Sequence, residues 1–377
     1  MDYELLRIIW WVLIGVLLIG FAVTDGFDLG VGALLRIIGR TDNERRVMIN
    51  TIGPHWDGNQ VWFITAGGAL FAAYPLIYAA SFSGFYFALL ITLAALWMRP
   101  VGFDYRSKLN NPAWRNGWDW ALFVSGIVPS LIFGVAIGNL FLGVPLQYDV
   151  MLRPAYDGGL LGLLRPFALL ARLVSVSMLL MHGAVWLQLK TDGFIRQRAV
   201  NVAIILGIST TVLFGVAGLW VGQLDGYLIT SAMDHNAPSN PLNKSVQLVA
   251  GGWLHNYVDF PLMIIAPVLG LVSPLLVAWL SKAGRSGLAF TASALALSGI
   301  ILTSGFSLFP FLMPSSTQLN ASLTVWDATS SETTLLIMFG VACVFVPIIL
   351  LYTAWGYWVM RGRVTEKAIE ADSHQLY

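Results

Sequence analysis

The stretch IIWWVLIGVLLIGFAVT, residues 8–24, decides the fold class of this chain. It holds 17 successive residues without a charge, and the apolar segment continues to Arg36. Such a segment, with about 1.5 Å of helical rise per residue, can cross the roughly 30 Å of hydrocarbon in a bilayer. The preceding residues, MDYE, are acidic, and no A-x-A-like cleavage site follows at a suitable distance. The stretch therefore predicts a retained membrane span and not a cleaved signal peptide.

Comparable apolar runs recur along the chain, separated by charged or Pro-, Gly- and Asn-rich breaks. Hydrophobic residues occupy 57% of the 377 positions and charged residues 11%, and the mean hydropathy is +0.73. Soluble proteins contain roughly 45–50% apolar and 25% charged residues. We expect an all-α polytopic membrane protein that forms a single integral membrane domain over residues 1–377. Two four-helix bundles plus one extra helix would accommodate the predicted spans, although no internal repeat is visible between residues. Nine transmembrane helices are predicted, at approximately residues 8–35, 58–74, 78–98, 118–142, 166–189, 200–222, 259–281, 287–312 and 335–359.

The positions of the basic residues predict the orientation of these spans. The loops after the first, third, fifth, seventh and ninth spans carry 16 of the 21 basic residues. Cytoplasmic loops carry such an excess of Lys and Arg. We therefore expect a periplasmic N-terminus and a cytoplasmic C-terminus. The remaining basic residues are Arg7, Arg153, Arg165 and Lys244 on the outer side, and Arg172 within a span.

The charge and the cysteine content exclude several classes of function. A net charge of +1 creates no overall field that would attract nucleic acid. Cys343 is the single cysteine, so an internal disulfide, an iron–sulfur cluster held by this chain and a thiolate zinc site are excluded.

Histidine is the natural protein ligand for haem, and only His182 lies well within a predicted span. A bis-histidine haem would need a second imidazole at similar depth, and the sequence shows none. We therefore interpret His182 mainly as a polar residue of helix packing, and we expect no catalytic residue or metal site in this chain. Arg172, near the outer end of the same span, can extend to the membrane surface.

Asp25 and Asp28 are the first candidate chemical groups, because charges inside a membrane span are costly and commonly functional. Their spacing of three places both carboxylates on one face of a helix. Seventeen uncharged residues precede them, so the pair could also lie at the cytoplasmic rim. An interfacial or helix-packing role and a role in proton handling or subunit contact both remain open.

A second candidate is the sequence GPHWDGNQVW, residues 53–62, just before the second span. Pro54 can open a helix, and Asp57 would then lie in its first turn, where the helix dipole stabilises a carboxylate. A plain helix start is one interpretation. However, His, Asp, Asn and Gln crowd into six positions at the membrane boundary, which favours a role in taking up protons or water.

The loop after the third span contributes further charged residues on the same side. Asp104 and Lys108 have the favourable i, i+4 order if the chain is locally helical there. A solvated charged loop explains most of these residues, and a hydrated vestibule shared with Asp57 is the alternative. The charged residues concerned are Arg99, Asp104, Arg106, Lys108 and Asp119.

The segment before the ninth span predicts a local structural feature. Thr329 and Glu332 have the spacing of a capping box, which would start that helix. Pro310 and Pro314 similarly predict the end of the eighth span.

Several of these motifs together resemble subunit II of the cytochrome bd ubiquinol oxidases. The similarity covers the chain from Asp2-Tyr3-Glu4 to Leu376-Tyr377, and the long HWDGNQVW string makes it specific. The motifs that carry it are GFDLG (26–30), HWDGNQVW (55–62), RPVGFDYR (99–106) and the segment from Phe309 to Ser331.

The resemblance implies an enzyme complex of the bacterial cytoplasmic (inner) membrane that oxidises ubiquinol and reduces oxygen to water without pumping protons. In this family subunit I binds two haem b and one haem d and carries the quinol-oxidising loop. Subunit II forms a heterodimer with it, within membrane lipid, and in some members holds a structural ubiquinone. A small single-helix accessory subunit usually accompanies the pair. The absence of a predicted haem ligand pair in this sequence agrees with that division.

The resemblance also implies roles for individual residues. Asp57 matches the family residue assigned to proton relay toward subunit I, with Asp104, Lys108 and Tyr377 near the proton entry. Trp62 matches a position associated with the mouth of an apolar oxygen path. The candidate proton pathway further includes Arg99, Asp119, Asp25 and Asp28.

Two other functions compete with this interpretation. A proton-coupled secondary transporter would also contain intramembrane carboxylates and many glycines, but transporters build midplane sites from broken helices in paired repeats. The sequence shows neither such a repeat nor acidic residues clearly at mid-depth. A b-type cytochrome would require axial ligands that the sequence does not obviously supply.

Overall fold

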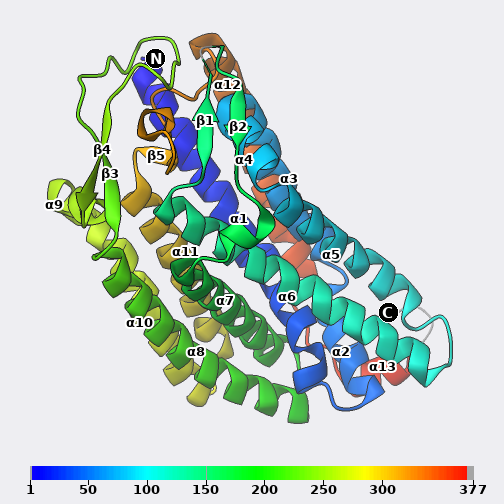
Figure 1. Cartoon of the computed structure of the whole chain (residues 1–377). Coiled ribbons are helices and arrows are strands. Elements are labelled where there is room, and N and C mark those ends of the chain that lie inside the picture. Colours follow the sequence, from blue (N-terminus) through cyan, green and yellow to red (C-terminus); the bar gives the residue numbers. More distant parts are fainter. Residues whose placement is uncertain (1, 150, 372–377) are drawn as a thin grey trace.

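The long first helix, α1 (Tyr3–Ile38), runs through the middle of the structure and contacts most of the other long helices. The computed structural model describes residues 2–149 and 151–371. Figure 1 shows the N-terminus at one end of the bundle, together with the strands, and α2 and α13 at the opposite end. We call these the strand end and the α2 end.

The first group consists of α1 and three long helices beside it. α1 packs against α3 and α6, and α5 packs against α6. The helix α3 is followed by the short helix α4 (Pro75–Gly84), which leads into α5. The long helices of this group are α1, α3 (Trp56–Ala73), α5 (Tyr86–Tyr105) and α6 (Pro112–Leu142).

Four further helices pack in a ring, each against its neighbours, and this second group joins the first where α7 meets α1 and α6. Together the two groups give the expected arrangement of two four-helix bundles. The members of the ring are α7 (Pro166–Lys190), α8 (Gly193–Val221), α10 (Ile265–Lys282) and α11 (Ser286–Leu308).

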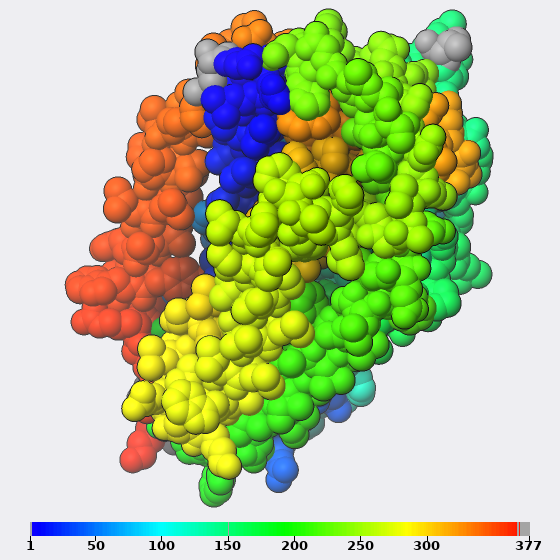
Figure 2. Space-filling view, turned by 90° about the vertical axis from the view of Figure 1, so that its left-hand side faces the viewer, coloured from blue at the N-terminus to red at the C-terminus, as the bar shows by residue number. Residues whose placement is uncertain are grey.

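The last long helix, α12 (Glu332–Val359), is the extra helix outside the two groups. Leu335 is its only buried residue, although the helix touches α1 and α3. Figure 2 shows it as an orange-to-red ridge that stands apart from α1 over part of its length. A strongly apolar helix with so little cover inside its own chain needs lipid or a partner protein around it.

Short elements close the two ends of the bundle. At the α2 end lie α2 (Asp42–Ile52) and α13 (Glu366–Ala371), which contact each other. A short helix, α9 (His255–Asp259), precedes α10. Three antiparallel hairpins are formed by β1 (Leu146–Tyr148) with β2 (Pro154–Tyr156), β3 (Asp225–Ile229) with β4 (Val246–Ala250), and β5 (Phe311–Met313) with β6 (Leu323–Thr324).

The all-α membrane architecture predicted from the sequence is confirmed. In the part of the chain that the structure describes, eight helices are long and apolar enough to span a membrane. The second predicted span, 58–74, corresponds to α3, whose 18 residues begin with the polar segment around Asp57 and Asn59 and are therefore less apolar. The number of crossings and their orientation stay predictions, as does the single domain over residues 1–377.

The third predicted span, 78–98, has the wrong boundaries. A helix break at Phe85 separates α4 from α5, and α5 continues through Pro100 to Tyr105. Tyr156 packs its ring directly against Gly84, where an added Cβ would lie 2.5 Å from the ring. The sequence is apolar on both sides of this break, so its composition gives no boundary signal.

The predicted capping box of Thr329 and Glu332 is also wrong. Helix α12 begins two residues later than the capping box predicts, with Ser331 as its N-cap and the Ser331 side chain accepting from the Thr334 amide. The Thr329 hydroxyl instead accepts a hydrogen bond of 2.9 Å from Nε of Arg7, which is fully buried. Thr329 therefore bonds to Arg7 of α1 and does not cap α12.

Candidate functional site

A cluster of polar side chains lies buried between α1, α3, α5 and α12. At its centre Arg99 forms a salt bridge with Asp25, in which Nη1 contacts Oδ1 and Nη2 lies 3.3 Å from Oδ2. Both side chains are almost completely buried, at 2% and 0% exposure. An arginine and a carboxylate in this two-pronged geometry neutralise each other where no water is available.

Asp28 lies one helical turn after Asp25 and has different partners. Its Oδ2 accepts a hydrogen bond of 2.8 Å from Nδ2 of Asn59, and Oδ1 of Asn59 accepts one of 2.5 Å from the Tyr357 hydroxyl. Oδ1 of Asp28 is buried without a hydrogen-bond donor among the described residues. We call Asp25, Asp28, Asn59, Arg99 and Tyr357 the carboxyl cluster.

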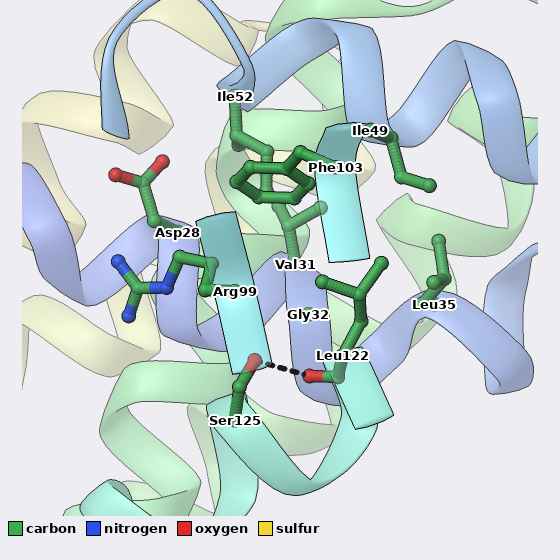
Figure 3. A pocket seen from close by; sticks show the side chains of 10 residues that line it. All are labelled: Asp28, Val31, Gly32, Leu35, Ile49, Ile52, Arg99, Phe103, Leu122 and Ser125. Atoms are coloured by element: carbon green, nitrogen blue, oxygen red, sulfur yellow. Dashed lines mark hydrogen bonds between the residues drawn. The ribbon is translucent and has the colours of Figure 1, made fainter. Parts of the chain in front are cut away.

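A small internal cavity of about 10 Å³ borders this cluster. Figure 3 shows the Asp28 carboxylate and the Arg99 guanidinium close together at one side of it, while apolar side chains such as Val31, Phe103 and Leu122 surround the rest. A cavity of this size and lining holds one water molecule at most. The cavity therefore leaves room for no more than a single water molecule beside the carboxyl cluster.

Aromatic rings cover the cluster toward the α2 end. The ring of His55, just before α3, stacks on Tyr357 at a centroid distance of 4.6 Å. Trp186 stacks on Phe27 at 3.9 Å and meets the edges of both His55 and Tyr357. Burial, and to a lesser degree the positive charge of Lys190, lowers the pKa of His55 to about 4. His55 is therefore a neutral ring at physiological pH and adds no charge to the cluster.

A second charged network lies near the α2 end, apart from the carboxyl cluster. Asp119, which is fully buried, binds Nε of Arg106 at 2.6 Å and Nη1 of Arg45 at 2.7 Å. Arg106 also contacts Asp42, which pairs with Arg115. This network joins the loop before α2, α2 itself, the end of α5 and the start of α6, and its charges alternate in sign.

The structure divides the candidate proton-pathway residues into three sets. Asp25, Asp28 and Arg99 come together in the carboxyl cluster, whereas Asp119 belongs to the second network. Asp57, Asp104 and Lys108 are exposed at the surface. Tyr377 lies outside the described residues.

Three expectations about exposure were wrong. Arg99, Arg106 and Asp119, expected mostly as members of a solvated loop, are buried at 2%, 1% and 0% exposure. The reason is that α5 continues seven residues beyond the predicted end at 98 and carries Arg99 into the bundle. Asp25 and Asp28, for which helix packing and proton handling both remained open, are buried inside the bundle at 0% and 1% exposure.

Asp104 and Lys108 do not share a helix. Helix α5 ends at Tyr105, and Lys108 lies in the turn that follows. The proposed i, i+4 pairing therefore lacks the helical geometry that it requires.

Trp62 is half-buried and lies across α1. An added Cβ on Gly20 would come within 2.5 Å of the Trp62 ring, so the glycine provides the space that the indole occupies. The indole is thus fixed against α1 by direct contact.

His182 is a packing residue, as interpreted from the sequence. Nδ1 lies 2.7 Å from the Ser293 hydroxyl and Nε2 lies 2.8 Å from the Val23 carbonyl. The ring is fully buried, and both of its nitrogens are occupied. The side chain does not fit the role of a haem ligand, and the described residues contain no group of His, Cys, Asp and Glu that could hold a metal ion.

Sequence reasoning missed two members of the carboxyl cluster, Asn59 and Tyr357. Asn59 stands in the quoted HWDGNQVW string, two residues after Asp57. Residues two apart on a helix point in different directions, so Asn59 reaches the buried side of α3 while Asp57 faces out. Tyr357 lies near the end of an otherwise apolar helix, and no local pattern marks it.

The chain matches the family model of the cytochrome bd terminal oxidase subunit II over residues 6–360. It is 57% identical to the cytochrome bd-I ubiquinol oxidase subunit 2 of Escherichia coli K12, over 100% of both chains. It is 54% identical to the probable cytochrome oxidase subunit 2 of Haemophilus influenzae, again over 100% of both. A relative from Bacillus subtilis, a cytochrome bd ubiquinol oxidase subunit 2, is 31% identical over 95% of this chain and 97% of its own.

Among solved structures, a chain of the bd oxidase from Geobacillus thermodenitrificans has the same fold, with a TM-score of 0.67. The two are 16% identical, and the similarity covers 94% of this chain and 98% of that one. The full-length match to the family model and the full-length identity to its curated relatives agree with the buried polar core and the helical architecture: this chain belongs to the cytochrome bd terminal oxidase subunit II family.

Proposed function

We propose that this chain is the second subunit of a membrane-bound quinol oxidase that oxidises ubiquinol and reduces oxygen to water. The observation that carries the proposal is the 57% identity to the Escherichia coli subunit over both complete chains. No feature of the structure favours the alternative of a proton-coupled transporter. The expected location is the bacterial inner membrane, which agrees with the eight apolar helices among the described residues.

The haem chemistry of this complex belongs to subunit I. Two haem b and one haem d, ligated by subunit I, would supply the electron transfer and the reduction of oxygen. His182 supports this division, because its two ring nitrogens are bonded to Ser293 and Val23. The role of the present chain is to support that partner and to give protons and oxygen access to it.

Helix α12 supports a heterodimer with subunit I. It exposes large apolar side chains over its whole length, among them Phe345, Leu351 and Trp355 at 56%, 72% and 60% exposure. Apolar side chains of this kind can pack against a second helical subunit or against lipid, and the identity to a named subunit 2 of an oxidase favours the subunit. A structural ubiquinone and a small single-helix accessory subunit would complete the assembly, with lipid around it.

The proton path of this proposal starts from exposed charged residues at the α2 end. Asp57, Asp104 and Lys108 face outward and can exchange protons with water. The buried acids are Asp25, Asp28 and Asp119. With the C-terminus in the cytoplasm, these exposed groups lie on the side from which oxygen reduction takes its protons. Tyr377 would stand beside the same entry, and Trp62 would border an apolar path for oxygen.

One purification tests the assignment of the complex. Reduced-minus-oxidised spectra of the chain isolated with its native partners should show haem bands, and spectra of the chain alone should show none. Haem retained by the isolated chain would contradict the proposal.

A pair of variants tests the proton path. Asp57→Asn should lower quinol oxidase turnover in the purified complex while the haem content stays constant. Asp192→Asn, at an exposed acid just before α8, is the matched control and should leave turnover unchanged. Equal turnover of Asp57→Asn and wild type would exclude a relay role for Asp57.

A further inference from the structure

The carboxyl cluster contains two acids and one base, and this imbalance has a chemical consequence. Asp25 and Asp28 lie together in the buried interior, and Arg99 is the cation that the described residues bring to them. The other polar members, Asn59 and Tyr357, are neutral. If both acids were ionised, the cluster would carry an uncompensated negative charge, which is very costly in a low-dielectric interior.

The geometry shows which of the two acids is ionised. Both terminal nitrogens of Arg99 donate to Asp25, so the guanidinium pairs with that carboxylate. Asp28 receives its hydrogen bond from the uncharged amide of Asn59. A neutral amide donor favours the ionised acid much less than a charged guanidinium does, so Asp25 is the more strongly stabilised carboxylate of the two.

The remaining oxygen of Asp28, Oδ1, is the atom on which a proton would lie. Oδ1 is buried and meets no donor among the described residues, which would leave an ionised oxygen unsatisfied. Asp25 and Asp28 stand three residues apart in α1, which makes their buried carboxyl groups neighbours on one face of the helix. Two neighbouring buried carboxyl groups disfavour ionisation of both, so that one of them keeps its proton.

We propose that the carboxyl cluster is a proton-binding site in which Asp28 holds one proton on Oδ1 and donates it to the ionised Asp25, whose charge Arg99 neutralises. The cluster is then electrically neutral, and every carboxyl oxygen has a partner. This inference does not rest on the relay role of Asp57, because Asp57 is exposed and takes no part in the hydrogen bonds that join the five members of the cluster.

The surroundings keep this proton apart from bulk water. Asn59 connects Asp28 to Tyr357, but a side-chain amide does not exchange protons readily, so the chain from Tyr357 to Asp28 orients the acid and does not conduct. His55 covers Tyr357 as a neutral ring. The cavity beside the acid is lined largely by apolar side chains, among them Val31, Phe103 and Leu122.

Infrared spectra of the purified oxidase complex test the proposal directly, with the spectrum of each variant subtracted from that of the wild type. The wild type should contain a carbonyl band of a protonated carboxylic acid, which shifts after the protein has been unfolded and refolded in D₂O. This band should be absent from Asp28→Asn and present in Asp192→Asn, the exposed control. Identical carbonyl spectra in wild type and Asp28→Asn would overturn the proposal.

A comparison of two isosteric variants gives an independent test. Asn has the shape and neutrality of a protonated Asp, so Asp28→Asn should yield assembled complex with the haem content and thermal midpoint of the wild type. Asp25→Asn removes the carboxylate that Arg99 binds, so that Asp28 has to ionise where no guanidinium nitrogen bonds to it, and the variant should lower the yield of assembled complex several-fold. If Asp28→Asn loses as much complex as Asp25→Asn, or if both are tolerated equally, the assignment of the proton to Asp28 is wrong.

Discussion

The hydroxyl of Tyr357 on α12 donates a hydrogen bond of 2.5 Å to Oδ1 of Asn59 on α3. It attaches α12, whose only buried residue is Leu335, to the buried carboxyl cluster. Asn59 in turn donates to Asp28 on α1, so one amide joins three helices. The position of the outer helix is therefore coupled to the hydrogen bonding of a buried acid.

Replacing Tyr357 with Phe should destabilise the folded complex by about 1–3 kcal/mol, because a buried amide oxygen loses its donor. Thermal unfolding of the purified complex measures this change. Tyr352→Phe, at a tyrosine of the same helix that is 71% exposed, is the control and should change stability little. Equal midpoints for both variants would show that the Tyr357 bond contributes nothing.

Replacing Arg99 with Met should cost about 3–5 kcal/mol, because it leaves Asp25 as an unpaired charge in the interior. The control is Arg153→Met, which removes an exposed pair with Asp149 in which Arg153 is 74% exposed. Such surface pairs contribute about 0–1 kcal/mol. The free energy of unfolding of both variants, measured in the same detergent, checks the difference, and a similar cost in both would contradict the buried pairing.

The contrast between these two arginines shows what the sequence could predict. Apolar runs predict the long helices, because each run has to cross the width of a membrane. Eight of the nine predicted spans accordingly correspond to apolar helices among the described residues. The pairing of Asp25 with Arg99 joins positions 74 residues apart, and no local spacing reports it. Likewise, the helical continuation through Pro100 is set by packing against α6, which overrides the usual breaking effect of proline.

A pH-dependent stability is expected from Glu44, at the start of α2. Hydrogen bonds from Arg198 lower the pKa of Glu44, and the backbone amides of Arg40 and Thr41 add to this against a smaller effect of burial. Because the folded pKa lies below the unfolded value, the stabilisation is complete above the unfolded pKa and is lost as the pH falls through the folded one.

The measurement compares wild type with Glu44→Gln over a pH series. The stability difference should be constant at neutral pH and should shrink as the pH falls below 4.5, the ordinary value for a glutamate. Glu366→Gln, at an exposed acid of α13, is the control. A difference that stays constant through this range would mean that the pairing with Arg198 does not favour the ionised form.

Replacing Arg7 with Gln should release the segment between β3 and β4 from its contact with α1. Arg7 is fully buried and donates to the carbonyls of His235 and Ala237 and to the hydroxyls of Ser239 and Thr329. These bonds hold the segment between β3 and β4 against α1. The variant should be cleaved faster by protease within residues 230–245 while the rest of the chain stays resistant, and an unchanged cleavage pattern would show that other contacts hold the loop.

The crossing of α1 and α7 allows a test of packing with a matched pair of glycines. A Cβ added to Gly30 would lie 2.9 Å from Cα and N of Gly183 and closer still to the Leu179 carbonyl, so backbone would have to move. Gly30→Ala should therefore destabilise the complex by about 1–3 kcal/mol, as overpacked cores do. At Gly67, within α3, an added Cβ meets nothing within 4 Å, and Gly67→Ala should be neutral or stabilising by up to about 1 kcal/mol, because alanine loses less backbone entropy in a helix. Thermal midpoints that move in opposite directions would confirm that α1 and α7 are in backbone contact at Gly30, whereas a neutral Gly30→Ala would place the two helices further apart.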